Sequence, residues 1–393
     1  MIEINPNKIK KSEIVVGIPS YNESDTISNV VKKVDAGLQK YFKGREAVII
    51  NGDNNSPDNT REVFLNTKTK APKIYVSTPS GLLGKGNNLR NIFLKIKDLG
   101  AVSSMLIDSD IKSATPEWVK CLISPIFNGY DYVGPIYYRD EDDGSITNHL
   151  CYPLIYGLLG YNIRQPIAGE VAFSKPVVEY WLKQKWFEQV KKFGVDIFMT
   201  VNVIKAGFKM CRVDLGARIH KSSAPKLDNM FLEVVDTFFN ILSNNKDLWQ
   251  REVDFHGLPL VCKAKATKYP DFELDYGQFE KKALFEFSNN YKAIRKCFSP
   301  ELWNEIEKTF GKEKVLKIDS NLWTQIVYEM FYAYNNTSNK KAIIKFLRPF
   351  YFARMVMFSK ETSNLNPQKT EQAIQKQAQN FYKKRGYLLS SMK

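Results

Sequence analysis

The chain has 393 residues, 44% of them hydrophobic and 25% charged, with a formal net charge of +15. This length suits one large domain plus a smaller one, and the composition is that of an ordinary globular protein, which argues against long disordered stretches. No apolar run approaches the roughly 18 residues that a membrane-spanning helix needs, and the N-terminus lacks the apolar stretch of a secretory signal.

Short β-branched segments alternate with amphipathic ones through the first half of the chain. We expect strands at Glu13–Pro19, Ala47–Asn51, Lys73–Thr78 and Val102–Asp108, and helices at Asp25–Phe42, from near Pro57, and at Gly84–Lys97. This alternation predicts an α/β fold with a doubly wound, mostly parallel sheet. Because ligands of such sheets bind beyond the carboxyl ends of the strands, the residues that close each strand are the candidates for function.

The second half of the chain has a different pattern. Segments such as LDNMFLEVVDTFFNIL and NLWTQIVYEMFYAYNN repeat apolar residues at intervals of three and four, which indicates packed helices. We therefore expect two domains, residues 1–225 and a helical C-terminal extension at residues 226–393. The basic stretch KAIIKFLRPFYFARMVMF could lie on a membrane surface, but its pattern favours a core helix. Aromatic residues of this region would serve equally as core or as a homodimer face.

The cysteines and the excess of basic residues bear on compartment and partners. The five cysteines are scattered and lack C-x-x-C spacing, so we expect buried thiols in a reducing compartment, the cytoplasm, with neither a disulfide nor a zinc site. Lysines are spread along the whole chain without a nucleic-acid-binding motif, so we expect no nucleic-acid partner. Part of the positive charge would attract an anionic substrate.

The sharpest local motif is Asp108-Ser109-Asp110, two carboxylates directly after a predicted strand. Carboxylate oxygens suit Mg²⁺ or Mn²⁺, and such an ion would bridge the diphosphate of a nucleotide. The alternative is an acidic turn or helix cap, but the position after a strand favours the metal. His220, which follows a later strand-like segment, is a candidate third ligand or an ordinary surface or core histidine.

Four weaker motifs can each be explained by a purely structural role at least as well as by a functional one. Gly84-Lys85-Gly86 opens a helix and would suit a phosphate, or it is a turn with a solvated lysine. Glu170 stands in the apolar QPIAGE, where it would need a partner if buried. Asp196 precedes an apolar helix, where the local sequence favours an N-cap. Arg139 could bind a carboxylate or phosphate, or pair with the acidic residues that follow it.

Taken together, the ordered motifs GIPSYNE, NGDNN, GKGNN, DSD, QPIAGE, GVDI and ARIH resemble those of retaining GT-A glycosyltransferases. The closest likenesses are to mannosylglycerate synthase and glucosyl-3-phosphoglycerate synthase, over about residues 13–222. The helical tail is similar to that of mannosylglycerate synthase in length, without sharp motifs.

This resemblance implies a role for each matching position. The implied metal ligands for Mg²⁺ or Mn²⁺ are Asp108, Asp110 and His220. The implied donor-binding residues are Pro19, Tyr21, Glu23, Asp53, Lys85, Asp108, Ser109, Ala168 and Gly169. Glu170 and Asp196 would stabilise the cationic sugar ring as catalytic residues. Arg139, Gly144 and Thr147 would bind the acceptor.

The implied reaction moves glucose or mannose from a UDP- or GDP-hexose to D-glycerate or a similar small hydroxy acid. The phosphoglycerate enzymes carry an arginine in their acceptor loop where this chain has Ser145, which leaves 3-phosphoglycerate as the weaker candidate. The main alternative is an inverting GT-A enzyme for a polysaccharide or lipid acceptor, but QPIAGE lacks the ED-type acidic pair. A nucleotidyltransferase would carry a Gly-rich loop where PSYNES stands.

Overall fold

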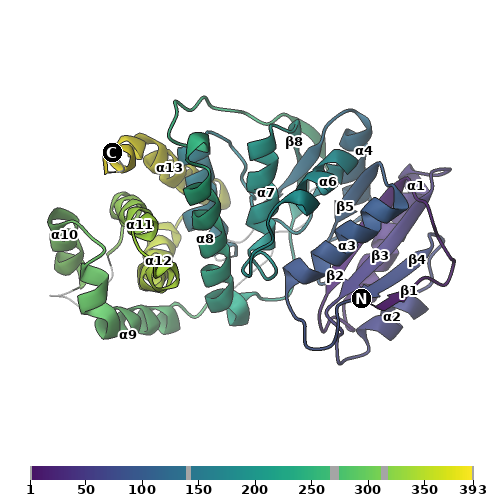
Figure 1. Ribbon diagram of the computed structural model, residues 1–393, viewed down its shortest axis with the longest axis horizontal. Helices are drawn as coiled ribbons and strands as arrows, with labels where there is room; N and C mark the ends of the chain where they lie inside the picture. The colour runs from purple at the N-terminus through teal and green to yellow at the C-terminus, as the bar shows by residue number, and fades with distance from the viewer. Residues whose placement is uncertain (1, 139–142, 266–273, 311–316, 392–393) are drawn as a thin grey trace. The chain divides into compact units, whose positions relative to one another are not determined.

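The structure is a computed structural model that describes residues 2–138, 143–265, 274–310 and 317–391. Its strands form one nine-stranded sheet in the order β1-β4-β3-β2-β5-β7-β6-β8-β9 (Figure 1). The strands are β1 (Ile2–Ile4), β2 (Ile14–Ser20), β3 (Ala47–Asp53), β4 (Lys73–Ser77), β5 (Ser103–Leu106), β6 (Tyr132–Tyr138), β7 (Ala172–Ser174), β8 (Met210–Ala217) and β9 (Leu260–Lys263).

Most neighbouring strands run parallel. The pairs β2–β3, β3–β4, β2–β5, β6–β8 and β8–β9 are parallel, whereas β1 on β4 and β7 between β5 and β6 are antiparallel. Every residue of β2 is buried, as expected for a central strand covered on both faces. The expected fold class, a doubly wound and mostly parallel sheet with a helical C-terminal region, is confirmed.

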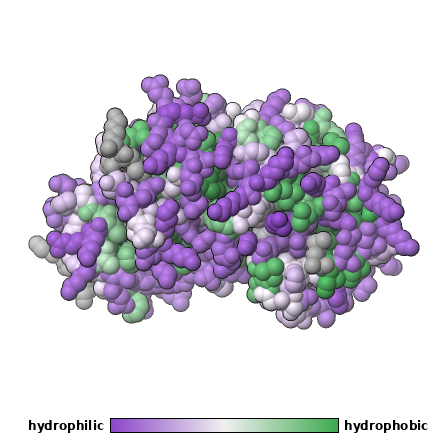
Figure 2. Space-filling model, in the orientation of Figure 1, coloured by the Kyte–Doolittle hydropathy of each residue, from purple (hydrophilic) through white to green (hydrophobic). Residues whose placement is uncertain are grey.

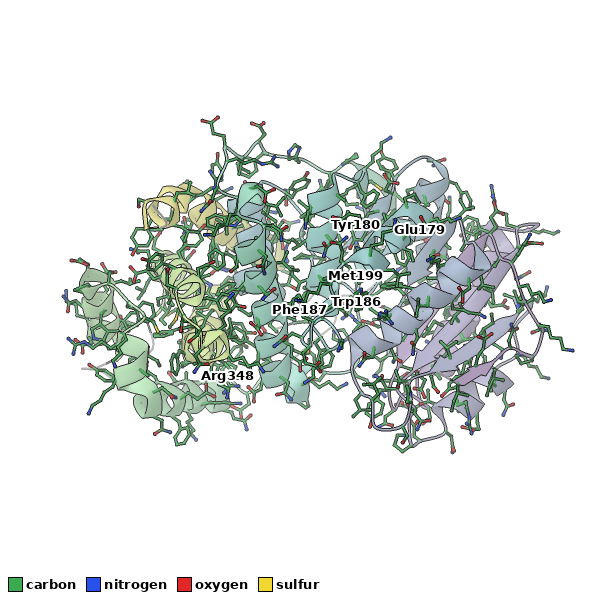
Figure 3. The ribbon with its side chains drawn as sticks, in the orientation of Figure 1. Glu179, Tyr180, Trp186, Phe187, Met199 and Arg348 are labelled. Atoms are coloured by element: carbon green, nitrogen blue, oxygen red, sulfur yellow. A yellow bond between two sulfur atoms is a disulfide. The ribbon has the colours of Figure 1, made fainter. Side chains whose placement is uncertain are left out.

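Helices cover both faces of the sheet. One face carries α1 (Ile27–Tyr41), α2 (Thr60–Asn66) and α4 (Pro116–Phe127), and the other carries α3 (Lys85–Leu99), α6 (Lys175–Lys183) and α7 (Val195–Ala206) (Figure 1). Gly37 lets α1 approach α4, because a Cβ there would lie 2.7 Å from Val119. Between α6 and α7, the Trp181 indole donates to the carbonyl oxygen of Met199 at 3.0 Å. Met199 is labelled in Figure 3.

The chain divides into two compact units. The first unit comprises residues 1–139, 164–223 and 258–270, and the second comprises residues 140–163, 224–257 and 271–393. This division differs from the single boundary expected after residue 225. Residues 140–163 group with the helices, and the chain returns to the sheet at β9, which pairs with β8.

The second unit is helical. It contains η1 (Thr147–Cys151) and η2 (Ile155–Leu159), both π-helical, together with α5 (Tyr152–Leu154), α8 (Leu227–Asn244), α9 (Tyr276–Arg295), α10 (Pro300–Phe310), α11 (Ser320–Asn335), α12 (Lys340–Thr362), α13 (Pro367–Lys383), α14 (Arg385–Ser391) and the 3₁₀ turns η3 (Ala224–Lys226) and η4 (Lys246–Leu248). Side-chain oxygens of Asp319, Asn339 and Asn366 cap three of these helices by accepting backbone N–H bonds.

The basic apolar stretch KAIIKFLRPFYFARMVMF forms most of α12, and the structure confirms it as a core helix. Phe350, Tyr351 and Phe352 are fully buried there, and Arg348 binds both carboxylate oxygens of Glu286 on α9 at 3.0 and 2.8 Å (Figure 3). Within the described residues, none of the helices combines the length and apolarity needed to cross a membrane. Figure 2 shows a mostly hydrophilic visible surface.

The cysteine prediction is wrong for one pair. Cys121 on α4 and Cys262 on β9 form a disulfide, with Cα atoms 5.4 Å apart, while Cys151, Cys211 and Cys297 are free thiols. The two residues are 141 positions apart in the sequence, and they meet because β9 joins the sheet edge beside α4. The cysteines therefore no longer argue for a reducing compartment, and the cytoplasmic location stays a prediction.

Candidate functional site

The residues predicted to bind the donor lie at the carboxyl ends of the central strands. Pro19 is in β2, with Tyr21 and Glu23 just after it, and Asp53 closes β3 in register with Ser20. Beyond β5 lie Asp108, Ser109 and Asp110, and residues 168–170 precede β7. The topology thus brings these separate segments to one edge of the sheet, where α/β proteins bind ligands.

Asp53 is fully buried and held by donors on both of its carboxylate oxygens. Oδ1 accepts from the Ser20 and Ser56 hydroxyls at 3.0 and 2.6 Å, and Oδ2 accepts from the Ser56 backbone N–H and the Tyr75 hydroxyl, each at 2.8 Å. Burial and the neighbouring Asp53 carboxylate raise the pKa of Tyr75, so the phenol stays a donor. Asp53 therefore organises the turn after β3, and contact with a nucleoside remains a prediction for it.

Five charged side chains form a connected cluster, which we call the charged cluster: Lys85, Asp108, Glu170, Asp196 and Arg218. Lys85 Nζ lies 3.1 Å from Asp108 Oδ1 and 3.0 Å from Asp196 Oδ2. Arg218 places Nη2 3.2 Å from Asp108 Oδ2 and Nε 3.0 Å from Glu170 Oε2. Asp108 thus contacts both cations, and each cation bridges two carboxylates.

Glycines allow the segments of the charged cluster to approach one another. A Cβ on Gly169 would lie 2.1 Å from Asp108 Oδ2, so only glycine lets this segment pass the carboxylate. Gly84, with φ of +126°, precedes the helix that begins at Lys85, and a Cβ on Gly86 would lie 1.9 Å from the Val190 carbonyl oxygen. The GKG motif is therefore packed tightly against residues 190–192, and the expected helix start is confirmed.

Burial sets the protonation states in the charged cluster. Burial raises the pKa of Asp196 to about 6, although the neighbouring Lys85 opposes this shift. Burial also disfavours the ionised form of Asp108, but Lys85 and Arg218 more than offset it and lower the pKa of Asp108. At Lys85 the carboxylates of Asp108 and Asp196 favour the charged amine more than burial disfavours it, so the pKa of Lys85 is raised. The Asp196 carboxyl group thus titrates closer to neutral pH than an ordinary aspartate does.

Two carboxylate oxygens of the charged cluster have no hydrogen-bond partner among the residues that the structure describes. Glu170 is fully buried, and its Oε2 accepts from Arg218 and from the Tyr137 hydroxyl, while its Oε1 makes no hydrogen bond. Asp196, which is 8% exposed, likewise leaves Oδ1 unpaired. Because buried polar atoms are seldom left unpaired, these two oxygens mark places where ligand hydroxyl groups or a positive charge would be stabilised.

The carboxylates outnumber the cations that face them. Asp110 lies close enough to Asp108 that the two interact, and burial followed by the Asp108 charge raises the pKa of Asp110. His220 interacts electrostatically with both aspartates. Oxygen ligands with excess negative charge fit a hard divalent cation. Among the described residues, however, no group of three or more His, Cys, Asp or Glu side chains is arranged as in a metal site.

The structure corrects one local interpretation and adds residues that the sequence did not single out. Asp196 does not cap α7, because Gly194 occupies the N-cap and the Asp196 side chain pairs with Lys85. Arg218 was not predicted, although it stands two residues before His220 in the same ARIH motif. Tyr137, on β6, was not predicted either, because its contact with Glu170 could not be inferred from the local sequence.

The remaining predicted residues are not members of the charged cluster. Glu23 accepts from the Thr26 hydroxyl and from Lys221 Nζ, each at 2.8 Å. Arg139 lies outside the described residues. Gly144, with φ of +76°, and Thr147, which opens η1, belong to the second unit.

Comparison with known proteins finds one family match, which covers part of the sheet domain. Residues 15–184 match the model of glycosyl transferase family 2. No curated protein matches the sequence. The solved structures similar to this chain include glucosyl-3-phosphoglycerate synthase from Mycobacterium tuberculosis with Mn²⁺, UDP and phosphoglyceric acid, at 23% identity, 58% coverage of this chain, 78% of that chain and a TM-score of 0.48. The same enzyme with Mn²⁺, UDP and glucosyl-3-phosphoglycerate matches at 23% identity, 59% and 79% coverage, and a TM-score of 0.47.

Proposed function

We propose, from the glycosyl transferase family 2 domain at residues 15–184, that this glycosyltransferase is a metal-dependent, retaining hexosyltransferase. It would move glucose or mannose from a UDP- or GDP-sugar to D-glycerate or a similar small hydroxy acid. The observation that carries the proposal is the charged cluster, which joins two cations and three carboxylates at the carboxyl edge of the sheet. This is where α/β sheets bind nucleotides.

On the donor side, Lys85 and Arg218 are the cations available to the diphosphate. Asp108, Asp110 and His220 are the proposed ligands of Mg²⁺ or Mn²⁺, which when bound would neutralise charge that builds on the leaving diphosphate. For Asp108 to serve as a ligand, its carboxylate must exchange its contacts with Lys85 and Arg218. After that exchange Lys85 still pairs with Asp196 and Arg218 with Glu170, and the donors that faced Asp108 could turn toward phosphate oxygens.

On the sugar side, Glu170 and Asp196 would act by electrostatic stabilisation. Each is buried and has one unpaired carboxylate oxygen, which can face positive charge on the ring as the bond to the leaving group lengthens. In front-face retention the departing phosphate oxygen takes the proton of the acceptor hydroxyl. No side chain is then required as nucleophile or base, and positioning supplies much of the rate.

On the acceptor side, Arg139, Gly144 and Thr147 are the proposed binding residues. The side chain at position 145 carries no positive charge, and the Ser145 hydroxyl is already bonded to the Tyr351 hydroxyl at 2.6 Å in the interior of the second unit. A phosphate on the acceptor would gain nothing from this position. We therefore propose glycerate or a similar unphosphorylated acid ahead of 3-phosphoglycerate.

The test is a screen of UDP-glucose, GDP-glucose and GDP-mannose against D-glycerate and 3-phosphoglycerate with Mg²⁺ or Mn²⁺, with the product anomer read by NMR. An α-linked glycerate product supports the proposal, and release of nucleotide by water alone contradicts the acceptor. As a matched variant, Asp110→Ala should abolish metal-dependent donor binding in calorimetry. Full transfer by that variant would remove Asp110 from the metal ligands.

A further inference from the structure

The segment at residues 144–151, which we call the acceptor segment, accepts hydrogen bonds from side chains of the C-terminal helices. The Trp323 indole on α11 donates to the His149 carbonyl oxygen at 2.6 Å. Gln377 on α13 donates through Nε2 to the Asn148 carbonyl oxygen at 2.8 Å, and the same nitrogen lies 3.2 Å from His149 Nδ1. All of these residues belong to the second unit.

A buried arginine donates a hydrogen bond to the side chain of Gln377. Arg354 on α12 is only 1% exposed, and it binds both carboxylate oxygens of Glu361 at 2.9 and 2.8 Å and the Ile318 carbonyl oxygen at 3.0 Å. Its Nε donates to Gln377 Oε1 at 2.8 Å. An arginine has only donors, so the amide oxygen of Gln377 must face it. The amide nitrogen of Gln377 is thereby turned toward the acceptor segment. This fixes the direction of the hydrogen bonds that run from Arg354 through Gln377 to Asn148.

The part of the acceptor segment that Gln377 contacts has an uncommon backbone. Residues 147–151 form a π-helical turn, a conformation that is rare and often found at functional sites. Thr147 opens this turn and is 1% exposed, and within the described part of the chain its hydroxyl oxygen has no hydrogen-bond partner. A relaxation toward α-helical geometry would turn Thr147 away from its present direction, because the two helix types differ in residues per turn.

We propose that Gln377, oriented by Arg354, is a positioning residue that keeps the acceptor segment in its π-helical form and the Thr147 hydroxyl available for the acceptor. The proposal rests on the proposed function for the identity of that ligand. It gives the helical C-terminal region a specific part in acceptor recognition. A single misplaced contact can cost up to about 100-fold in rate, so a hydrogen bond this remote from the chemistry can matter.

Two variants at one position test this. Gln377→Glu retains an oxygen that accepts from Arg354 but has no N–H for Asn148, and Gln377→Leu removes both contacts. Gln379→Leu, an exposed residue on the same helix, controls for the substitution itself. Tyr334→Phe removes a buried 2.7 Å hydrogen bond to Asp236 elsewhere in the second unit and controls for lost stability.

We expect both Gln377 variants to raise the acceptor KM about 10-fold while the donor KM and the hydrolysis of donor by water stay unchanged. Backbone hydrogen exchange at residues 144–151 should quicken in both. The two controls should show neither effect, even where Tyr334→Phe unfolds at lower denaturant. Unchanged exchange in the Gln377 variants overturns the positioning role, as does a KM rise of equal size in Tyr334→Phe. Should the wild type transfer to no acceptor, the proposed function fails, and the exchange measurement alone decides the positioning role.

Discussion

The burial of Glu170 makes a strong prediction about Arg218. Glu170 is fully buried, and its only hydrogen bonds among the described residues are those from Arg218 and Tyr137. Arg218→Met keeps most of the side-chain volume but removes the positive charge. Because this leaves a buried carboxylate without its counter-charge, we expect the free energy of unfolding to fall by roughly 3–5 kcal/mol. The lost contact with partly exposed Asp108 adds little to this.

The measurement is urea denaturation followed by circular dichroism, for four proteins in a double-mutant cycle. Glu170→Gln removes the charge that Arg218 balances, so the double variant Arg218→Met/Glu170→Gln should regain much of the lost stability, with a coupling of about 2 kcal/mol. Arg90→Met, an exposed arginine on α3, should change stability little. The reasoning that Arg218 permits Glu170 to be buried would be refuted by either of two results. One is a fall of less than about 1 kcal/mol in the free energy of unfolding of Arg218→Met, and the other is additivity of the two single-variant effects in the double variant.

Three further predictions concern pH, the disulfide and the acceptor. Burial raises the pKa of Asp196 from 3.8 to about 6, so the protonated carboxyl group stabilises the fold below pH 3.8 and this effect is lost as the pH rises through 6. Relative to Asp196→Asn, the free energy of unfolding of the wild type should fall by about 3 kcal/mol over that interval. Parallel pH profiles of the two proteins would contradict this. Reduction should remove about 4–5 kcal/mol of stability by opening the long Cys121–Cys262 loop, and Cys121→Ser should be insensitive to reductant in urea melts. Arg139→Ala should raise the acceptor KM about 10- to 100-fold with the donor KM unchanged, which initial-rate kinetics can check, and an unchanged acceptor KM would remove it from the site.

The sequence predicted the sheet well because its signals are local. The expected strand Glu13–Pro19 becomes β2, Ile14–Ser20, and the expected helix Gly84–Lys97 becomes α3, Lys85–Leu99. These segments have apolar patterns and flanking turn residues that propensity and periodicity detect. The short edge strands β1 and β9 have no such pattern, since their residues are largely exposed and their pairing is fixed by distant partners.

The parts of the site that the sequence did not reveal depend on long-range packing. Arg218 meets Glu170 across 48 positions, and Lys85 meets Asp196 across 111. Local reasoning therefore assigned Asp196 to a helix cap, a role that aspartate often has, whereas its partner is the partly buried Lys85 of another helix. The disulfide was missed for the same reason. Contacts of this kind follow only from the completed topology.

The charges of the site themselves argue for a divalent cation, independently of any relative. Four carboxylates, those of Asp108, Asp110, Glu170 and Asp196, lie around two cations, Lys85 and Arg218. Although the whole chain has a net charge of +15, the carboxylates here outnumber the basic side chains, and that excess disfavours an approaching diphosphate. A divalent cation on Asp108 and Asp110 would offset this excess of two carboxylates, and it would let Lys85 and Arg218 exchange their contacts with Asp108 for contacts with the phosphates. Donor binding should accordingly require the metal even where the nucleoside is well held, because the unaided site attracts cations more strongly than nucleotides.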